Sequence, residues 1–447
     1  MNNQNNVTPI PTGVPPKKQR VTADGEAARY LAIQMENKQR SRGADILLIL
    51  LTLGFIYVMA ILFWVLPDAD FSPAENRSLK TAPVVSAETF FSGQLTAEVS
   101  DYMADQFPFR GFFVGLKALS ETVQFKGENN DVIFGSSGYL IARNDYPNEA
   151  FLTSNLEAAA RFSAVAQERG IDCVAAFAGR KMDTLDLYLP KLYGSYYGDR
   201  IWSRLDTIAT ENDLPYLDLR QELRTRASAG EPVYYKTDHH WTSLGAYYAY
   251  ADVMEAFGEA ALPLSAFTEE IASEDFYGTT WSSAGVKWAQ PDTITYYHGD
   301  PDATYRMEIQ MPRAEFEERF ANHAGCTFEE IDGKGYAVFS DIYVREFLDE
   351  KDQYASFIGG NFGYTHITRT DAGERETLLL VKDSFSHSMV QFLCEHYDLI
   401  LVDLRYYKAS MMKLCEEAGV RKVLMLYNME TLTEGNDLSV LKAGLGK

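Results

Sequence analysis

The stretch Lys236–Ser243 brings together residue types that serve hydrolytic chemistry. It sets a carboxylate, Asp238, beside two imidazoles, His239 and His240, in a chain that has only seven histidines. In an extended segment residues i and i+2 lie on the same side, so Asp238 can bond the Nδ1–H of His240 and leave Nε2 free. A carboxylate and the imidazole that it orients are two of the three members of a Ser-His-Asp triad, and the imidazole is its general base. We therefore expect Asp238 to orient His240 as a general base.

The nucleophile that would complete the triad is predicted at Ser384. The run Leu378–Val381 is apolar, as in a strand buried on both faces, and Met389–Cys394 begins a helix. A serine at such a strand-to-helix corner projects its hydroxyl, and the first N–H groups of the helix point into the same space. Those groups can stabilise an oxyanion. The alternative role for Ser384 is a helix cap, and His387, three residues later, is a rival base.

The Asp-His-His-Trp run at residues 238–241 resembles the signature of the DHHW family of bacterial surface proteins. Residues 382–385 and 403–407 resemble further blocks of that family, and the resemblance runs from about residue 75 to about residue 428. The family is similar to the SGNH-hydrolase-like domains of alginate O-acetyltransferases, which carry an Asp-x-His-Trp motif before the serine. The resemblance implies an α/β, SGNH-hydrolase-like three-layer fold with a mostly parallel sheet.

The same resemblance implies which residues assist Ser384 as base, oxyanion donor or substrate contact. It favours His240 as the base, with His239 as a partner behind it; the reverse assignment is the alternative. Asn428 ends a strand where the family's asparagine block would fall, and is a candidate oxyanion donor. Arg405 replaces a small residue of the glycine block, and either binds substrate or pairs with Asp383.

Three other positions are candidates for binding or support. Lys181 follows a buried strand where related acetyltransferases carry a basic residue, and either holds a polar substrate group or is a solvated loop charge. Asn361 is either an oxyanion donor or a turn residue. Trp241 is expected to pack beneath His240 and hold its ring plane, with a direct substrate contact as the alternative.

The alternative to a triad at the motif is a metal site made by Asp238, His239 and His240, because carboxylate and imidazole are both metal ligands. Adjacent histidines seldom converge on one ion, and the sequence has no third block with ligand spacing. We therefore predict no metal and no cofactor.

Helices and buried strands alternate through the region that carries these motifs. Leu152–Arg169 has the three-to-four spacing of an amphipathic helix, and Ile171–Phe177 then reads as a buried strand. The alternation indicates a parallel α/β sheet, whose sites form at the carboxyl ends of strands. Thr242 or Ser243 is expected to cap the helix after the motif. We predict an SGNH-like domain over residues 131–447, with a mostly surface insertion at about 260–350, and a stalk over 67–130.

Charge and cysteine content exclude some functions. Acidic residues outnumber basic ones, 63 to 41, for a net charge of −22. Nucleic-acid binding calls for a basic footprint, so no such partner is predicted. The four cysteines are scattered and form neither a disulfide framework nor a metal-ligand pattern.

Residues 46–66 contain no charge and no proline. A helix rises about 1.5 Å per residue, so this run covers the roughly 30 Å hydrocarbon layer and predicts a transmembrane helix. Lys38, Arg40 and Arg42 precede it, whereas Asp68 and Asp70 follow. Because Lys and Arg stay inside, residues 1–45 are expected to be a cytoplasmic tail and residues 67–447 to lie outside the cell.

Taken together, these features predict a membrane-anchored acyl (acetyl) transferase or esterase that acts on a cell-surface or exported polysaccharide. A transferase would also need a donor, expected to be a separate membrane protein that supplies the acyl group. The rival hypothesis is a non-catalytic carbohydrate-binding or assembly protein of the cell envelope, which the departure at Arg405 supports.

Overall fold

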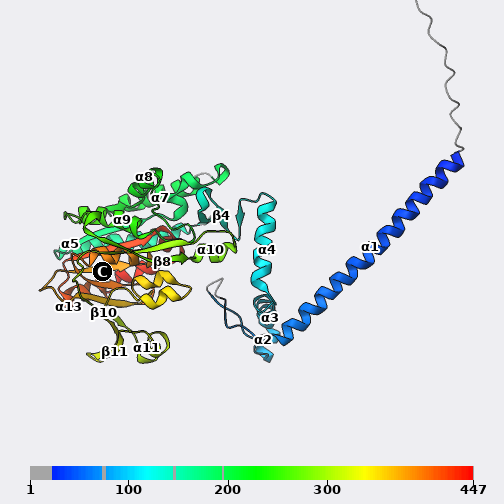
Figure 1. Ribbon diagram of the computed structural model, residues 1–447. Helices are drawn as coiled ribbons and strands as arrows, with labels where there is room; N and C mark the ends of the chain where they lie inside the picture. Colours follow the sequence, from blue (N-terminus) through cyan, green and yellow to red (C-terminus); the bar gives the residue numbers. More distant parts are fainter. Residues whose placement is uncertain (1–22, 73–76, 144–146, 194–195, 446–447) are drawn as a thin grey trace, which may run out of the picture. The chain divides into compact units, whose positions relative to one another are not determined.

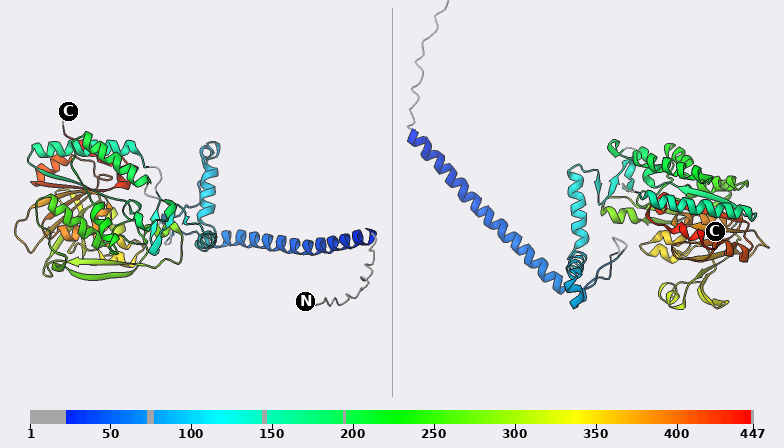
Figure 2. Two further views of the ribbon diagram at one scale, coloured as in Figure 1. Left: turned by 90° about the horizontal axis from the view of Figure 1, so that it is seen from above. Right: turned by 180° about the vertical axis from the view of Figure 1, so that it is seen from behind.

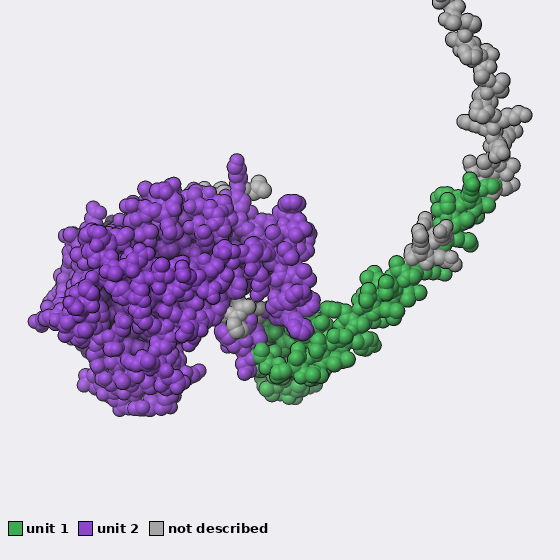
Figure 3. All heavy atoms as spheres, in the orientation of Figure 1, with its two compact units in different colours: residues 1–69, 80–108 green, residues 70–79, 109–447 purple. Residues whose placement is uncertain are grey.

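The computed structural model describes residues 23–72, 77–143, 147–193 and 196–445. Contacts within the chain divide it into two compact units, shown in two colours in Figure 3. One unit comprises residues 1–69 and 80–108, and the other comprises residues 70–79 and 109–447. Residues 1–22 of the predicted cytoplasmic tail lie outside the described residues.

The first unit contains the candidate membrane span. Its helices are α1 (Ala23–Val65), α2 (Ala87–Phe91) and α3 (Gln94–Asp105). Within α1, residues Arg42–Val65 have a mean hydropathy of 2.9, and this stretch is long and apolar enough to cross a membrane. None of it is buried inside the structure. The stretch agrees in position with the predicted transmembrane run at residues 46–66.

The second unit is a mixed α/β domain built on a large sheet (Figure 1). Among the described residues this sheet has nine strands. In spatial order they are β11 (Cys326–Ile331), β12 (Lys334–Phe339), β10 (Tyr305–Gln310), β13 (Tyr364–Arg369), β15 (Asp398–Val402), β14 (Thr377–Lys382), β16 (Lys422–Asn428), β6 (Asp172–Ala178) and β7 (Tyr216–Asp218).

The sheet is mixed, so the prediction of a mostly parallel sheet was wrong. β15, β14, β16, β6 and β7 pair in parallel, whereas β11, β12, β10 and β13 extend the sheet from β15 with antiparallel pairing. Three of the added strands come from the region expected to be a mostly surface insertion. Its acidic residues alternate with apolar ones, so that Met307 and Ile309 are buried while Glu308 between them faces the other side.

Alternate residues of the central strands enter two separate cores, because successive side chains of a strand point to opposite faces. On β14, Leu378 and Leu380 belong to one core, and Leu379 and Val381 belong to the other. The first core also takes in α8 (Arg220–Ser228), α9 (Ser243–Ala256) and α12 (Val390–Leu393). The second takes in α5 (Glu149–Glu168), α7 (Tyr196–Glu211), α13 (Met411–Ala418) and α14 (Met429–Glu434). The sheet therefore lies between two helical layers (Figure 2).

The remaining α-helices and strands of this unit lie outside the nine-stranded sheet. They are β1 (Phe71–Ser72), β2 (Arg77–Ser78), α4 (Arg110–Val123), β3 (Glu128–Asn129), β4 (Val132–Phe134), β5 (Leu140–Ala142), α6 (Lys181–Thr184), β8 (Thr268–Phe276), α10 (Thr279–Ala284), β9 (Asp292–His298) and α11 (Arg313–Arg319).

Parallel register brings three candidate residues to one edge of the sheet. Val381 of β14 pairs with Val402 of β15 and with Met425 of β16. Ser384, Arg405 and Asn428 each stand three residues beyond one of these paired positions. Because carboxyl ends of adjacent parallel strands lie side by side, the three residues converge at the edge where α/β sheets form their sites.

Candidate active site

The Asp-His-His-Trp motif forms a tight loop, and the prediction of an extended segment was wrong. A bridge between Tyr234 and Trp241 closes the loop. Inside it, the Asp238 carboxylate accepts the backbone N–H of His240 at 3.0 Å, as in an Asx turn. The carboxylate thus folds back over its own chain, and this turn brings it beside the imidazole two residues on. Thr242 is the residue that caps the following helix α9.

Asp238, His240 and Ser384 form a continuous chain of hydrogen bonds. Asp238 Oδ1 lies 2.6 Å from His240 Nδ1, and His240 Nε2 lies 2.8 Å from Ser384 Oγ. An ionised carboxylate can only accept, so Nδ1 carries the ring hydrogen and Nε2 turns its lone pair to the serine hydroxyl. Burial raises the pKa of Asp238, but His239, His240 and the hydrogen bonds outweigh it and hold that pKa well below its usual range. The structure therefore brings together the three residues predicted to be catalytic.

Thr279, at the start of α10, supports both the carboxylate and the second histidine. Asp238 Oδ2 accepts the Thr279 backbone N–H at 2.8 Å and its hydroxyl at 3.0 Å. His239 Nδ1 lies 2.7 Å from the same hydroxyl oxygen, and its ring lies against His240 with centroids 3.8 Å apart. Asp238, His239 and His240 offer ligand atoms within 4.8 Å of one another. In the structure His240 Nε2 bonds Ser384, and His239 Nδ1 and Asp238 Oδ2 bond Thr279, an arrangement that fits proton transfer.

Ser384 lies at the strand-to-helix corner that the sequence indicated. β14 ends at Lys382, and the 3₁₀-helix η7 (Ser384–Met389) follows and leads into α12. The cap of this helix is Asp383, whose carboxylate accepts the N–H of Phe385 at 3.0 Å and the N–H of Asn428 at 2.7 Å. One of the helix N–H groups expected to stabilise an oxyanion is therefore already engaged by Asp383.

The candidate oxyanion donor Asn428 is buried where β16 meets α14. Its Nδ2 donates to the Gly179 carbonyl at 2.8 Å, and its Oδ1 accepts the N–H of Glu430 at 2.9 Å. A side-chain amide has two N–H hydrogens, so one remains beyond the bond to Gly179. Asn428 lines the same cavity as Ser384.

Arg405 also lines the Ser384 cavity but pairs differently from the prediction. Its NH2 lies 2.6 Å from Asp403, so the ion pair is with Asp403 and the predicted pair with Asp383 was wrong. The reason is local, since Asp403 accepts both the backbone N–H and the guanidinium of Arg405 two residues later. The same guanidinium donates to Asn361 Oδ1 at 2.9 Å, and Asn361 lines a separate cavity.

Lys181 is buried, and its side chain bonds backbone carbonyls beside the site. Its Nζ donates to the carbonyls of Leu140 at 2.8 Å and Lys236 at 3.2 Å, and burial lowers its pKa to about 8. Of the two alternatives for Lys181, the solvated loop charge is therefore wrong. Lys236 directly precedes the motif, so this lysine ties the end of β6 to the loop that carries Asp238 and His240.

Trp241 is completely buried and does not pack beneath His240 as expected. Its indole N–H donates to Ser388 Oγ at 3.0 Å, and its ring meets Phe385 edge-on with centroids 5.3 Å apart. The ring that stacks on His240 is Tyr354, with centroids 3.9 Å apart and an interplanar angle of 9°.

Two further residues of the site were not identified correctly from sequence. Tyr354 lies in the 3₁₀-helix η6 (Gln353–Phe357), and no motif or spacing marked it. The rival base His387 is buried, and its Nε2 lies 2.7 Å from Lys382 Nζ. Burial and the neighbouring Lys382 hold the pKa of His387 well below its usual range. The hydrogen bond to the serine belongs to His240 instead.

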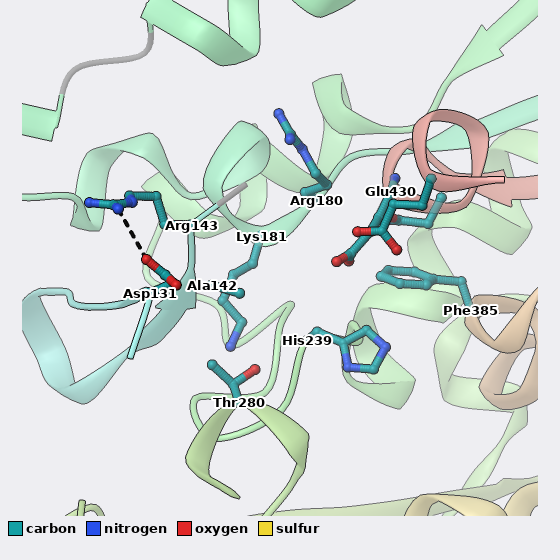
Figure 4. A pocket seen from close by; sticks show the side chains of 11 residues that line it. Asp131, Ala142, Arg143, Arg180, Lys181, His239, Thr280, Phe385 and Glu430 are labelled. Carbon is teal, nitrogen blue, oxygen red and sulfur yellow. Dashed lines mark hydrogen bonds and ion pairs between the residues drawn. The ribbon is translucent and has the colours of Figure 1, made fainter. Parts of the chain in front are cut away.

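Two cavities of about 440 and 330 Å³ lie beside the serine. His239, Phe385 and Asn428 line both, whereas Ser384 lines the smaller and Lys181 the larger. Figure 4 shows Lys181 on one side of the larger cavity and His239 and Phe385 on the other. The volumes fall in the range of sites that bind small molecules.

The comparison with protein families matches residues 220–403 to the DHHW protein family. Among solved structures, a DHHW family protein from Eubacterium siraeum is 21% identical, with 72% of this chain and 98% of that chain covered and a TM-score of 0.52. PatB1 of Bacillus cereus, solved with a sulfonyl adduct, is 18% identical, with 69% and 98% covered and a TM-score of 0.52. No curated protein matches the chain.

The solved structures show a shared fold, and the family match covers the motif loop and the serine turn. The resemblance predicted from the Asp-His-His-Trp run is thus confirmed: residues 220–403 match the DHHW family.

Proposed function

We propose that this protein is a membrane-anchored, outward-facing serine acyl (acetyl) transferase or esterase of SGNH-like type that acts on a cell-surface or exported polysaccharide. The observation that carries the proposal is the hydrogen-bond chain from Asp238 through His240 to Ser384. A serine hydroxyl is a weak nucleophile until an adjacent base takes its proton. A base held in one tautomer by a carboxylate is the arrangement that activates serine in acyl transfer.

In the proposed reaction Ser384 Oγ forms a bond to the acyl carbonyl carbon as His240 Nε2 takes the hydroxyl proton. Asp238 stabilises the imidazolium that results. The tetrahedral intermediate collapses when the bond to the leaving oxygen breaks and His240 returns the proton to it. The acyl group then rests on Ser384 until a sugar hydroxyl or water attacks its carbonyl carbon while His240 takes the proton of the attacking group. The bond from the carbonyl carbon to Ser384 Oγ breaks, and His240 returns that proton to Oγ.

The developing oxyanion needs donors beside Ser384. We assign this role to Asn428, whose amide has a hydrogen beyond the one given to Gly179, with Arg405 contributing positive charge from the adjacent strand end. Both residues line the cavity that Ser384 lines.

We propose an acetyl group and a polysaccharide acceptor because the motifs resemble those of alginate O-acetyltransferases. A transferase also needs an acyl donor on the outer side, and we propose that a separate membrane protein supplies it. PatB1, which shares the fold, was solved with a sulfonyl adduct. A sulfonyl fluoride that reacts with base-activated hydroxyls is therefore a suitable probe of Ser384.

The test is hydrolysis of a chromogenic acetyl ester by the full chain in detergent, with and without a polysaccharide acceptor. Ser384→Ala is expected to lower kcat by at least roughly 10³-fold, because the triad acts as a unit. The matched control is Ser283→Ala, which removes an exposed serine hydroxyl from the lining of the same cavity. Acetyl recovered on the acceptor identifies a transferase, and acetate alone identifies an esterase. Full activity of Ser384→Ala would disprove the proposal.

A further inference from the structure

Tyr354 contacts both partners of the hydrogen bond between His240 and Ser384. Its ring lies nearly parallel to the imidazole, with centroids 3.9 Å apart and an interplanar angle of 9°. Its hydroxyl donates to the backbone carbonyl of Ser384 at 3.2 Å. The side chain is 4% exposed, so these contacts are enclosed in the core. One tyrosine thus stacks on the ring of the base and bonds the backbone of the nucleophile.

The hydrogen bonds around Tyr354 have only one consistent direction. The Ser384 carbonyl can only accept, so the tyrosine O–H donates to it. Ser388 Oγ lies 3.2 Å from the same tyrosine oxygen, and it accepts the indole N–H of Trp241 at 3.0 Å. The Ser388 hydroxyl therefore donates to Tyr354. Burial raises the pKa of Tyr354, so the phenol keeps its hydrogen.

A single chain of donors results, from Trp241 through Ser388 and Tyr354 to the Ser384 carbonyl. It links the last residue of the Asp-His-His-Trp motif to the turn that carries the serine. It joins distant segments, because Trp241 and its partner Ser388 are 147 positions apart.

The relative placement of base and nucleophile matters for rate, since an error of about 1 Å in a reacting group can cost roughly 10²-fold. The second torsion of histidine is broad, so the imidazole needs a neighbour to hold its plane. We infer that Tyr354 is a positioning residue that holds His240 in plane with its ring and holds Ser384 in register with its hydroxyl. This role rests on the proposed function of Ser384 and His240.

Two substitutions separate the functions of the ring and the hydroxyl. Tyr354→Phe keeps the stacked ring and removes the donor, and is expected to lower kcat for a small acetyl ester roughly two- to tenfold, the effect of one hydrogen bond. Tyr354→Leu removes the ring as well and is expected to lower kcat roughly 10²-fold. KM should change little in both, because Tyr354 positions catalytic groups and does not line the Ser384 cavity.

The matched controls are Tyr343→Phe and Tyr343→Leu. Tyr343 is also buried and stacked on an aromatic ring, Tyr296, with centroids 3.9 Å apart, and its hydroxyl bonds the Tyr297 carbonyl at 3.1 Å. These variants should lower the melting temperature as the Tyr354 variants do and leave kcat unchanged. An equal loss of kcat in both pairs would reduce Tyr354 to a general packing residue and overturn the inference.

The donor chain is tested by combining Tyr354→Phe with Ser388→Ala. Residues of one network are not additive, so the double variant should lose little more activity than the worse single variant. Strictly additive losses would show that the two hydroxyls act separately and would contradict the chain.

A crystal structure of Tyr354→Leu provides a readout that needs no activity. The expected result is a His240 ring turned out of its present plane, with the contact to Ser384 Oγ broken. An unchanged His240 ring would overturn the inference, whatever Ser384→Ala shows in the ester assay. Conversely, full activity of Ser384→Ala would end the proposed function while the His240 ring of Tyr354→Leu still decides the positioning role.

Discussion

Lys382, one residue before the cap Asp383, shows how the surroundings of single side chains decide their chemistry. The lysine is buried next to His387, and burial lowers its pKa to about 8. His387 Nε2 accepts from the lysine, so the lone pair that a base would need is already used. From sequence His387 was a rival to His240. The folded structure distinguishes the two imidazoles by their hydrogen-bond partners. His240 bonds the Ser384 hydroxyl, whereas His387 bonds the buried Lys382.

Lys382→Met is expected to change how stability depends on pH. The pKa of Lys382 is about 8 in the folded protein, against 10.5 for an ordinary lysine. Between these values the unfolded chain binds more protons, so the free energy of unfolding of the wild type rises with pH across that window. The penalty for the buried charge is fully present below pH 8 and amounts to roughly 3 kcal/mol. The variant should therefore be more stable than the wild type at pH 7, with a flatter rise.

Urea unfolding at steps from pH 7 to pH 10.5 measures this slope. Lys413→Met serves as the control, because the Lys413 side chain is 73% exposed. Equal slopes in the wild type and in Lys382→Met would show that burial does not lower the pKa of Lys382.

At the scale of elements, the site depends on the short helix α10 and the residue before it, which pack against the Asp-His-His-Trp motif. Gly278 immediately precedes α10, whose first residue Thr279 binds the Asp238 carboxylate. A Cβ on Gly278 would overlap both the Cβ and the carboxylate of Asp238. The close approach of α10 to the motif therefore requires a residue without a side chain.

Gly278→Ala is expected to displace Asp238 and to release its hold on the His240 ring. We expect kcat for a small ester to fall roughly 10- to 10²-fold, the effect of a small misplacement of a catalytic group. Stability should fall by about 1–3 kcal/mol from overpacking. Gly373→Ala is the matched control, because a Cβ at Gly373 meets open space. Ester hydrolysis and thermal unfolding measure both effects, and a fully active Gly278→Ala would show that the Asp238 contact does not matter.

At the scale of the whole molecule, the proposed surface activity depends on α1. Residues 46–65 of this helix carry no charge, and none of the Arg42–Val65 stretch is buried in the structure. A helix that is hydrophobic all round needs either a protein core or a bilayer around it. We propose that it spans the membrane, with the N-terminus in the cytoplasm because Arg and Lys precede the span.

The full chain is expected to stay with the membrane fraction after alkaline extraction. Leu51→Arg combined with Ile56→Arg should release it, since each arginine near the centre of a span costs about 2.5–3.5 kcal/mol. Ile33→Arg with Met35→Arg, in the part of α1 before the span, is the control and should stay anchored. On intact cells, external protease should remove a C-terminal tag and spare an N-terminal one; the opposite pattern would reverse the proposed orientation.

The sequence by itself determined the local features of this protein. Helix periodicity, buried strand runs and turn residues act over a few positions, so α5, β6, β14 and β16 lie close to where the sequence indicated them. The apolar run that coincides with the span in α1 is likewise a property of one segment. Asp238, His240 and Ser384 were found because two short motifs carry them.

Only the tertiary structure decided what depends on contacts between distant residues. The antiparallel strands β10 to β13 join the sheet by backbone pairing with segments distant in the chain, which no local pattern encodes. The stacking of Tyr354 on His240, the ion pair of Arg405 with Asp403 and the hydrogen bond of Trp241 to Ser388 are also set by packing. A sequence states which side chains are available, but the free energy of burying them together depends on neighbours that only the folded chain brings into contact.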